Sequence, residues 1–324
     1  MTAALTDSAP PSPGDGELTH LGLFYAGAEE FLATTVPFCR EGLARDDAIL
    51  AVTTPANIAL LRRALGKAST RMEFADAAEW YRMPGSTLGA YHRWVEQRTA
   101  DAPDRHVRLI GEPVWHGKDA LETAEWTRYE SAVNVAFAGC AASIICPYDT
   151  RALPDGVLAD ARRTHPEVAV GGVGRPSESY AEPTAGETWR RPLAPVVAEG
   201  EEAVMRFGAD LSPVRTAVAE AATALGLTGE RAQRLVFAVN EVATNAVQHG
   251  SGDGRVVVRR AGGRVVCDVT STGRNEADWY LGYLPPDPHQ RSGQGMWVVR
   301  QLCDLLEVHT DHDRTTVRLH ISLT

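Results

Sequence analysis

The first half of the chain alternates short apolar runs with segments whose apolar residues recur at helical spacing. The runs of strand length lie at 21–25, 48–53, 72–74, 106–111 and 142–146. The segments with helical spacing lie near 29–43, 55–65, 86–99, 121–137 and 155–163. Strands and helices that follow one another in turn are typical of a parallel α/β sheet, and we predict such a sheet here.

The second half has a different pattern. From 173 to about 196 the residues are mainly Gly, Pro, Ser, Glu and Thr without periodicity, which indicates a linker. After it we expect a helix, a second helix between Thr228 and Gly250 as caps, a hairpin that turns at Gly262-Gly263, a long irregular segment, and a helix followed by two strands. These elements are expected at 214–225, 229–249, 255–270, 273–292, 295–304, 306–309 and 315–321.

This order predicts an α+β domain of two layers, with a mostly antiparallel sheet covered by helices on one face. We therefore divide the chain into a disordered tail at 1–18, an α/β domain at 19–170, a linker at 171–200 and an α+β domain at 201–324. A length of 324 residues is enough for two domains that each bury a core.

Charge and composition narrow the class of protein. Lys and Arg number 32 against 42 Asp and Glu, a net charge of -10, whereas a nucleic-acid binder usually has a basic surplus. Lys67 and Lys118 are the only lysines, and neither stands in a phosphate-binding motif, so phosphoryl chemistry that depends on lysine is excluded. The five cysteines form no C-x-x-C pair and indicate no metal site.

We expect a cytoplasmic protein with no membrane partner. The longest apolar stretch, 133–146, is interrupted by Asn134 and Ser143 and is too short to cross a bilayer. The first 17 residues lack the basic start and apolar core of a signal peptide. An odd number of cysteines fits a reducing compartment.

The predicted helix that ends at Gly250 has a polar stripe of four residues, Glu241, Asn245, Gln248 and His249. Such a stripe is most often a solvated face. A second motif favours a functional interpretation: Gly293-Gln-Gly295-Met296 stands at the start of the last predicted helix, where free N–H groups can bind phosphate.

Taken in order, these motifs resemble the ATP-binding domain of the GHKL superfamily, the Bergerat fold, in its anti-sigma-factor serine/threonine kinase branch. Residues 236–249, VFAVNEVATNAVQH, resemble the N box of that branch. Residues 293–299, GQGMWVV, resemble its second glycine box, and 315–321, TTVRLHI, its last strand. The resemblance covers about 203 to the C-terminus.

The resemblance implies ATP and Mg²⁺ as cofactors, with Glu241 as general base and Asn245 as the Mg²⁺ ligand. The segment 274–292 would be the nucleotide lid. The implied cofactor-binding positions are Asn245, Ser271, Gly273, Gly293, Gly295, Met296 and Thr315.

Two residues depart from the family pattern. Ser271 stands where the first glycine box has the aspartate that accepts the adenine amino group, and Arg314 replaces the glycine before the threonine of the last strand. A neutral hydrogen bond in place of a charge-assisted one weakens the binding of adenine by about 1–2 kcal/mol.

Polar and aromatic residues follow two strands predicted in the first half. Ligands bind at this edge of open α/β sheets, although Glu-Pro and Cys-Pro can also simply end strands. The candidates for a sensory site are Glu112, Trp115, Glu130, Cys146, Tyr148 and Asp149.

These residues resemble the MEDS sensory domain, which implies a RecA-like parallel sheet without a phosphate loop and a role in sensing a signal or small ligand. The matching segments are 20–25, 74–76, 111–115, 130–134, 146–149 and 164–166. The loop after the first strand, Ala26-Gly-Ala-Glu-Glu, cannot bind a triphosphate as a P-loop does.

Two functions remain open at this stage. The first is a kinase that phosphorylates a Ser or Thr of an anti-sigma-factor antagonist and otherwise binds a sigma factor, with a homodimer implied by resemblance. The second is a non-catalytic module that sequesters a sigma factor or antagonist, which Ser271 favours. A histidine kinase is a poorer fit, because the linker has no histidine after His165 that could accept a phosphoryl group.

Overall fold

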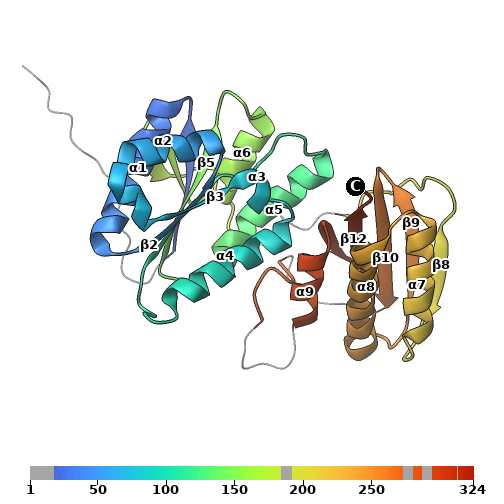
Figure 1. The fold of residues 1–324 in the computed structure, drawn as a ribbon. Coiled ribbons are helices and arrows are strands. Elements are labelled where there is room, and N and C mark those ends of the chain that lie inside the picture. The colour runs from blue at the N-terminus through green and yellow to red at the C-terminus, as the bar shows by residue number, and fades with distance from the viewer. Residues whose placement is uncertain (1–17, 184–191, 273–279, 287–293, 312) are drawn as a thin grey trace, which may run out of the picture. The chain divides into compact units, whose positions relative to one another are not determined.

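The computed structural model describes residues 18–183, 192–272, 280–286, 294–311 and 313–324. The chain divides into two compact units, one formed by 1–82 with 91–184 and the other by 83–90 with 185–324 (Figure 1). The tail expected at 1–18 lies almost entirely outside the described residues. Within the described parts, no helix has both the length and the apolar character that a membrane crossing requires.

The first unit is built on a seven-stranded sheet in the order β3-β2-β4-β5-β1-β6-β7. All neighbouring strands are parallel except β6 and β7, which confirms the predicted α/β class. The strands are β1 Thr19–Tyr25, β2 Ala48–Thr53, β3 Glu73–Asp76, β4 Val107–Gly111, β5 Ala142–Asp149, β6 Glu167–Val170 and β7 Val173–Pro176. The helices are α1 Ala28–Arg45, α2 Pro55–Leu65, the 3-10 helix Gly66–Arg71, α3 Ala77–Trp80, α4 Pro84–Thr99, α5 Ala120–Ala136 and α6 Asp155–Thr164.

The two faces of this sheet are covered by different helices. Because successive side chains of a strand alternate between faces, β1 contributes to both. Leu21, Leu23 and Tyr25 pack with buried residues of α1 and α2 in one core cluster. The side chain of His20 points to the other face of the sheet, where it is hydrogen-bonded to Asn134 of α5. The sheet therefore separates two buried environments.

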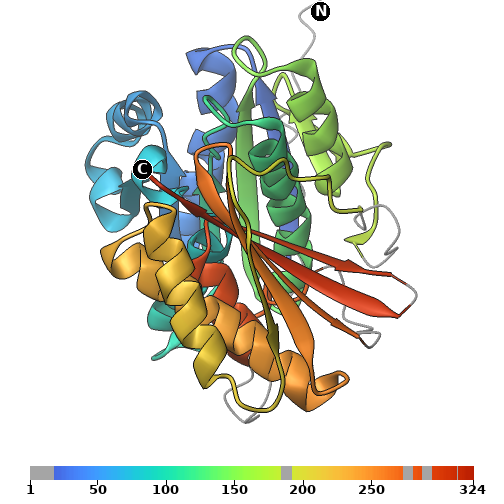
Figure 2. The same ribbon diagram turned by 90° about the vertical axis from the view of Figure 1, so that its right-hand side faces the viewer.

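The second unit has five antiparallel strands in the order β11-β12-β10-β9-β8, covered on one face by helices (Figure 2). This confirms the predicted two-layer α+β architecture. The strands are β8 Ala203–Phe207, β9 Gly254–Ala261, β10 Arg264–Thr272, β11 Leu305–Thr310 and β12 Arg314–Ser322. The helices are α7 Ser212–Ala224, α8 Gly229–His249 and α9 Gln294–Leu302.

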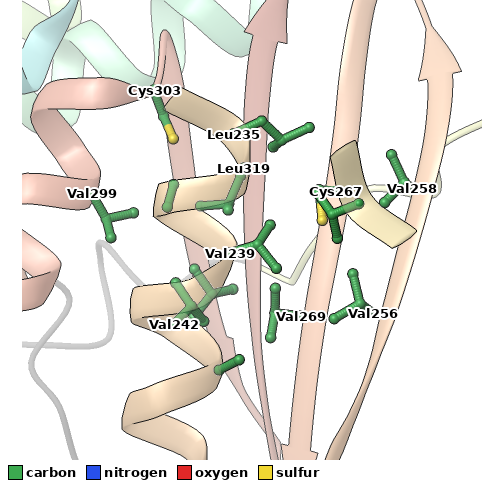
Figure 3. Close-up of a cluster of buried hydrophobic side chains, with 14 of the residues drawn as sticks. Leu235, Val239, Val242, Val256, Val258, Cys267, Val269, Val299, Cys303 and Leu319 are labelled. Atoms are coloured by element: carbon green, nitrogen blue, oxygen red, sulfur yellow. The ribbon is translucent and has the colours of Figure 1, made fainter. Parts of the chain in front are cut away.

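The core of this unit lies between α8 and the sheet (Figure 3). Leu235, Val239 and Val242 occur at spacings of four and three along α8, so they form one apolar stripe on the helix. They face Val269 of β10 and Leu319 of β12. Burial of this stripe fixes the rotation of α8 about its axis, and thereby the direction of its polar residues.

The ends of α8 differ from the expected caps. Thr228 precedes the helix in an extended conformation, but its side chain makes no capping hydrogen bond. Gly250 follows the helix with a φ of -107°, not in the left-handed region, and its N–H donates to the Ala246 carbonyl. Glycine is required there for space, because a Cβ would lie 2.6 Å from that carbonyl oxygen.

The stretch expected to be a linker, 171–200, contains ordered contacts at both ends. β7 adds an antiparallel strand to β6, although Gly174 and Pro176 are poor strand formers. Near the other end, the Arg318 guanidinium donates to the Ala194 carbonyl at 2.6 Å, and the Glu199 N–H donates to the Arg260 carbonyl at 2.7 Å. These two contacts tie part of the stretch to the second sheet.

Candidate functional site

A cleft of about 210 Å³ lies between α8, the sheet and the start of α9 in the second unit. Five of the residues for which we predicted a role in ATP binding line it: Asn245, Ser271, Gly295, Met296 and Thr315. The remaining lining residues are Val242, Ala246, His249, Gly250, Val269, Leu281 and Val317. The structure thus brings together residues from four elements that are distant in sequence.

The polar stripe of α8 is divided between the cleft and the solvent. Asn245 lines the cleft half-buried, and His249 lines it one turn further along the helix. Gln248 is exposed and lies outside the lining. Glu241 is half-buried beside the cleft, and its Oε1 accepts a hydrogen bond from Asn240 Nδ2 at 3.5 Å.

Gly295 allows the side chains of Glu241 and Asn245 to come close to the backbone where α9 begins. A Cβ built on this residue would lie 3.1 Å from Glu241 Oε2 and 3.6 Å from Asn245 Nδ2. The first N–H groups of a helix lack partners within the helix, so Gly295 and Met296 can present theirs to an anion. A carboxamide oxygen and free helix N–H groups are the donor set that a metal-bound polyphosphate needs, so this space fits Mg·ATP.

Ser271 and Thr315 lie opposite each other in the ladder between β10 and β12. Both line the cleft, and Thr315 Oγ1 is 3.3 Å from Thr310 Oγ1. Among the described residues that line the cleft there is no carboxylate. Ser271, at the position where the resemblance led us to expect an aspartate, contributes to this lining.

Arg300 of α9 holds the segment 281–283 against the helix. Its Nε donates to the Leu281 carbonyl at 2.6 Å, and its guanidinium carbon lies 3.8 Å from the centre of the Tyr283 ring. Between them Gly282 has a φ of 76°, and a Cβ there would lie 2.4 Å from the Met296 carbonyl oxygen. This packing positions Leu281 at the edge of the cleft.

Part of the predicted site lies outside the described residues. Gly273 and Gly293 are not described, nor is most of the lid predicted at 274–292. Arg314, the second departure from the family pattern, is exposed at the start of β12 and exchanges hydrogen bonds with Asp311.

In the first unit, Glu112 forms the centre of a buried hydrogen-bond network. Its carboxylate accepts from Tyr25 Oη at 2.7 Å, from Asn57 Nδ2 at 2.9 Å and from the hydroxyl of Thr53. Burial, together with the charge of Glu112, raises the pKa of Tyr25. These partners come from β1, β2 and α2, so Glu112 links three elements on one face of the sheet.

Three other sensory candidates, Glu130, Cys146 and Tyr148, gather elsewhere, on the face where His20 lies. Burial raises the pKa of Glu130 to about 8 and lowers that of His20 to about 4. Trp115 is buried with its ring centre 6.3 Å from that of Tyr148, whereas Asp149 is ion-paired with the exposed Arg151. The predicted candidates therefore do not form a single site.

Sequence reasoning missed two kinds of residue. His249 belongs to the predicted polar stripe but was not among the predicted cofactor-binding residues, although it lines the cleft one turn after Asn245. His20 and His165 were not singled out either, and both lie within 4 Å of Glu130 Oε2. No local pattern identifies these two, because they belong to segments far apart in the chain.

Comparison with protein families agrees with both units. Residues 19–166 match the family model described as the MEthanogen/methylotroph, DcmR Sensory domain, MEDS. Residues 208–321 match the histidine kinase-like ATPase domain. The chain is therefore a MEDS sensory domain fused to a histidine kinase-like ATPase domain. A comparison with curated proteins found no significant match.

Proposed function

We propose that this protein is a cytoplasmic signalling regulator whose ATPase-like domain is a serine/threonine protein kinase of the anti-sigma-factor type. The N-terminal domain would receive a small-molecule signal. The phosphoryl acceptor would be a Ser or Thr of an anti-sigma-factor antagonist, and a sigma factor would be the alternative partner. The observation that carries the proposal is the cleft, in which Asn245 faces the start of α9 with Glu241 beside Gly295.

Each of these residues would have a defined task in the proposed phosphoryl transfer. The Asn245 carboxamide oxygen would hold Mg²⁺, and that ion, when bound, neutralises charge on the phosphates. The N–H groups of Gly295 and Met296 would donate to the phosphate oxygens on which charge develops. Glu241 would accept the proton of the attacking hydroxyl, with its carboxylate oriented by Asn240.

The Arg215 guanidinium extends this chain of contacts. It donates to Asn240 Oδ1 at 3.1 Å, while Asn240 Nδ2 donates to Glu241. Because the amide oxygen of Asn240 is used by Arg215, its NH₂ group is turned toward the glutamate. Arg215 is thus a positioning residue for the proposed base.

Ser271 favours a second candidate function, a module that binds a sigma factor or antagonist without nucleotide turnover. A hydroxyl can accept the hydrogen bond of an adenine amino group only as a neutral acceptor, which weakens binding about tenfold. A domain with such a cleft could keep its fold and partner surface while losing catalysis.

Transfer of label from γ-labelled Mg·ATP to a panel of purified anti-sigma-factor antagonists tests the kinase. Transfer by the wild-type chain that is lost in Glu241→Gln and kept in Glu230→Gln, an exposed glutamate of the same helix, supports the proposal. Undiminished transfer by Glu241→Gln contradicts the role of this residue. Tight binding of an antagonist with no transfer and no dependence on ATP supports the second candidate.

A further inference from the structure

Four side chains with metal-ligating atoms converge inside the N-terminal unit. His20 of β1, Glu130 of α5, Cys146 of β5 and His165 after α6 are all buried, and their ligand atoms lie within 4.8 Å of one another. Each comes from a different element, so the fold and not local sequence creates the cluster. The five cysteines indicated no metal site by their spacing, because Cys146 has its neighbours only in three dimensions.

The cluster contains polar atoms with no hydrogen-bond partner among the described residues. Both carboxylate oxygens of Glu130 and the Nε2 atom of His165 are buried without one. An unpartnered buried polar atom destabilises the folded state, and an unpaired buried charge destabilises it more. The Cys146 thiol and the Tyr148 hydroxyl are the neighbouring groups that can donate to Glu130, and a cation would satisfy both the carboxylate and His165 Nε2.

The hydrogen bonds of both histidines direct their Nε2 atoms into the cluster as acceptors. Asn134 Nδ2 donates to the Thr164 carbonyl at 2.7 Å, so Asn134 Oδ1 faces His20 and accepts from its Nδ1–H at 3.0 Å. His165 Nδ1–H donates to the Ala161 carbonyl at 2.7 Å. A neutral imidazole has one N–H, so both Nε2 atoms carry lone pairs.

These lone pairs face the carboxyl group of Glu130 and the sulfur of Cys146. Nε2 of His165 lies 3.5 Å from Glu130 Oε2, and Nε2 of His20 lies 3.8 Å from the same oxygen and 3.4 Å from Cys146 Sγ. The thiol of Cys146 has a single proton to donate. A cation that is shared by all four groups satisfies every one of them.

We propose that the MEDS domain binds one zinc ion through four side chains: His20, Glu130, Cys146 and His165. Imidazole nitrogen, thiolate sulfur and carboxylate oxygen are the ligands that zinc takes in tetrahedral sites. The usual Zn–N and Zn–S bond lengths place ligand atoms about 3.3–3.6 Å apart. Three of the separations here are 3.4, 3.5 and 3.8 Å, and all of them are within 4.8 Å. Thiolate and carboxylate together balance the charge of Zn²⁺, which makes burial of the centre favourable.

The surroundings indicate a structural site with no open coordination position. The ordered Nδ1–H bonds to Asn134 and to a helix carbonyl are the outer contacts that usually orient metal-bound histidines. The cavity bordered by Glu130 and Cys146 has a volume of about 10 Å³, room for no more than one water molecule. A Cβ at Gly22 would lie 3.2 Å from His165 Cγ, so glycine leaves room for this ring.

Zinc analysis and Co²⁺ substitution of the full chain, prepared without a polyhistidine tag and without nucleotide, test the proposal. We expect one zinc per chain as purified. After removal of zinc with a chelator, we expect one Co²⁺ per chain with the visible bands of tetrahedral Co²⁺ and a near-ultraviolet thiolate charge-transfer band. Cys146→Ser should lose the charge-transfer band, and Cys39→Ser, also buried in this domain, should keep it.

Further variants separate metal binding from folding. Glu130→Gln, which keeps the shape of the side chain, should bind zinc more weakly and retain the thiolate band. Asn134→Ala should lower zinc affinity about 10–100-fold through the orientation of His20. Asn245→Ala, in the other domain, should leave the metal content unchanged. A folded wild-type chain that binds neither zinc nor Co²⁺ stoichiometrically, or a charge-transfer band that survives in Cys146→Ser, overturns the proposal.

Discussion

Ser271 of β10 is the direct partner of Thr315 of β12, and both residues line the cleft of the ATPase-like domain. Ser271 continues the row of Cys267 and Val269, whose side chains pack in the core beneath α8. Thr272, the next residue along the strand, belongs to the opposite face. A replacement at residue 271 therefore changes the polarity of the cleft and leaves the core side chains of Cys267 and Val269 in place.

Replacement Ser271→Asp should raise the affinity for ATP about tenfold, because it restores a charged acceptor for the adenine amino group. Titration calorimetry with Mg·ATP measures the change. Thr272→Asp adds the same charge to the opposite face and is the matched control. An equal gain in both variants would show that general electrostatics, and not the position of residue 271, governs binding.

Replacement Gly295→Ala should weaken ATP binding at least tenfold, with little change in thermal stability. The new methyl group would lie 3.1 Å from Glu241 Oε2 and occupy space at the start of α9. Alanine also favours a helix over glycine by about 1 kcal/mol, which offsets the cost of this contact. Gly208→Ala, where a Cβ meets nothing within 4 Å, should leave affinity unchanged. Normal ATP binding by the Gly295→Ala variant would show that the phosphates do not bind at the start of α9.

Replacement Glu112→Ala should lower the free energy of unfolding by about 2–4 kcal/mol, because it leaves the buried donors of Tyr25, Thr53 and Asn57 without an acceptor. Urea denaturation measures the loss. Asp149→Ala, which breaks the ion pair with the exposed Arg151 side chain and the hydrogen bond from the Arg151 backbone N–H, should cost about 1 kcal/mol. Similar losses in the two variants would contradict the central role of Glu112 in this network.

Acidification should destabilise the MEDS domain through His92. Its ring stacks on Phe137 with centres 4.5 Å apart, and burial lowers its pKa from 6.5 to about 4. Above pH 6.5 the ring is neutral in both states. As the pH falls from 6.5 toward 4, the unfolded chain takes up a proton that the folded chain does not, so stability falls.

A His92→Gln variant should therefore show a smaller loss of stability than wild type over the range from pH 6.5 to 4. His116→Gln, at an exposed histidine, should follow the wild-type curve. Coincident curves for wild type and His92→Gln in thermal unfolding between these pH values would show that His92 does not contribute.

Most of the fold could be predicted from sequence because its main elements have strong periodicity. The stripe of α8 and the hairpin of β9 and β10 depend on local patterns alone. β6, β7 and β8 were missed, since they have four or five residues each and gain their hydrogen bonds only from neighbouring strands. Short strands of this kind carry little local signal.

The candidate sites divide in the same way. Asn245 and Gly295 could be identified because they stand in ordered motifs, and the structure places both at the cleft. The sequence could not show that Glu112 and Glu130 belong to different clusters. The two lie on opposite faces of the sheet, because Tyr25 and His20, their neighbours on β1, point to opposite sides. His165 could not be assigned to Glu130, since 35 positions separate them and only the return of the chain after α6 brings them to 3.5 Å.

The central claim is that the second domain binds Mg·ATP through Asn245 and the start of α9. Titration calorimetry of the full chain with ATP, in the presence and absence of Mg²⁺, tests it most directly. We predict saturable binding of one ATP that requires Mg²⁺, is weakened at least tenfold in Asn245→Ala and is unchanged in Gln248→Ala, an exposed residue of the same helix. No binding by the wild-type chain up to millimolar ATP, or equal affinity in Asn245→Ala, would contradict the claim.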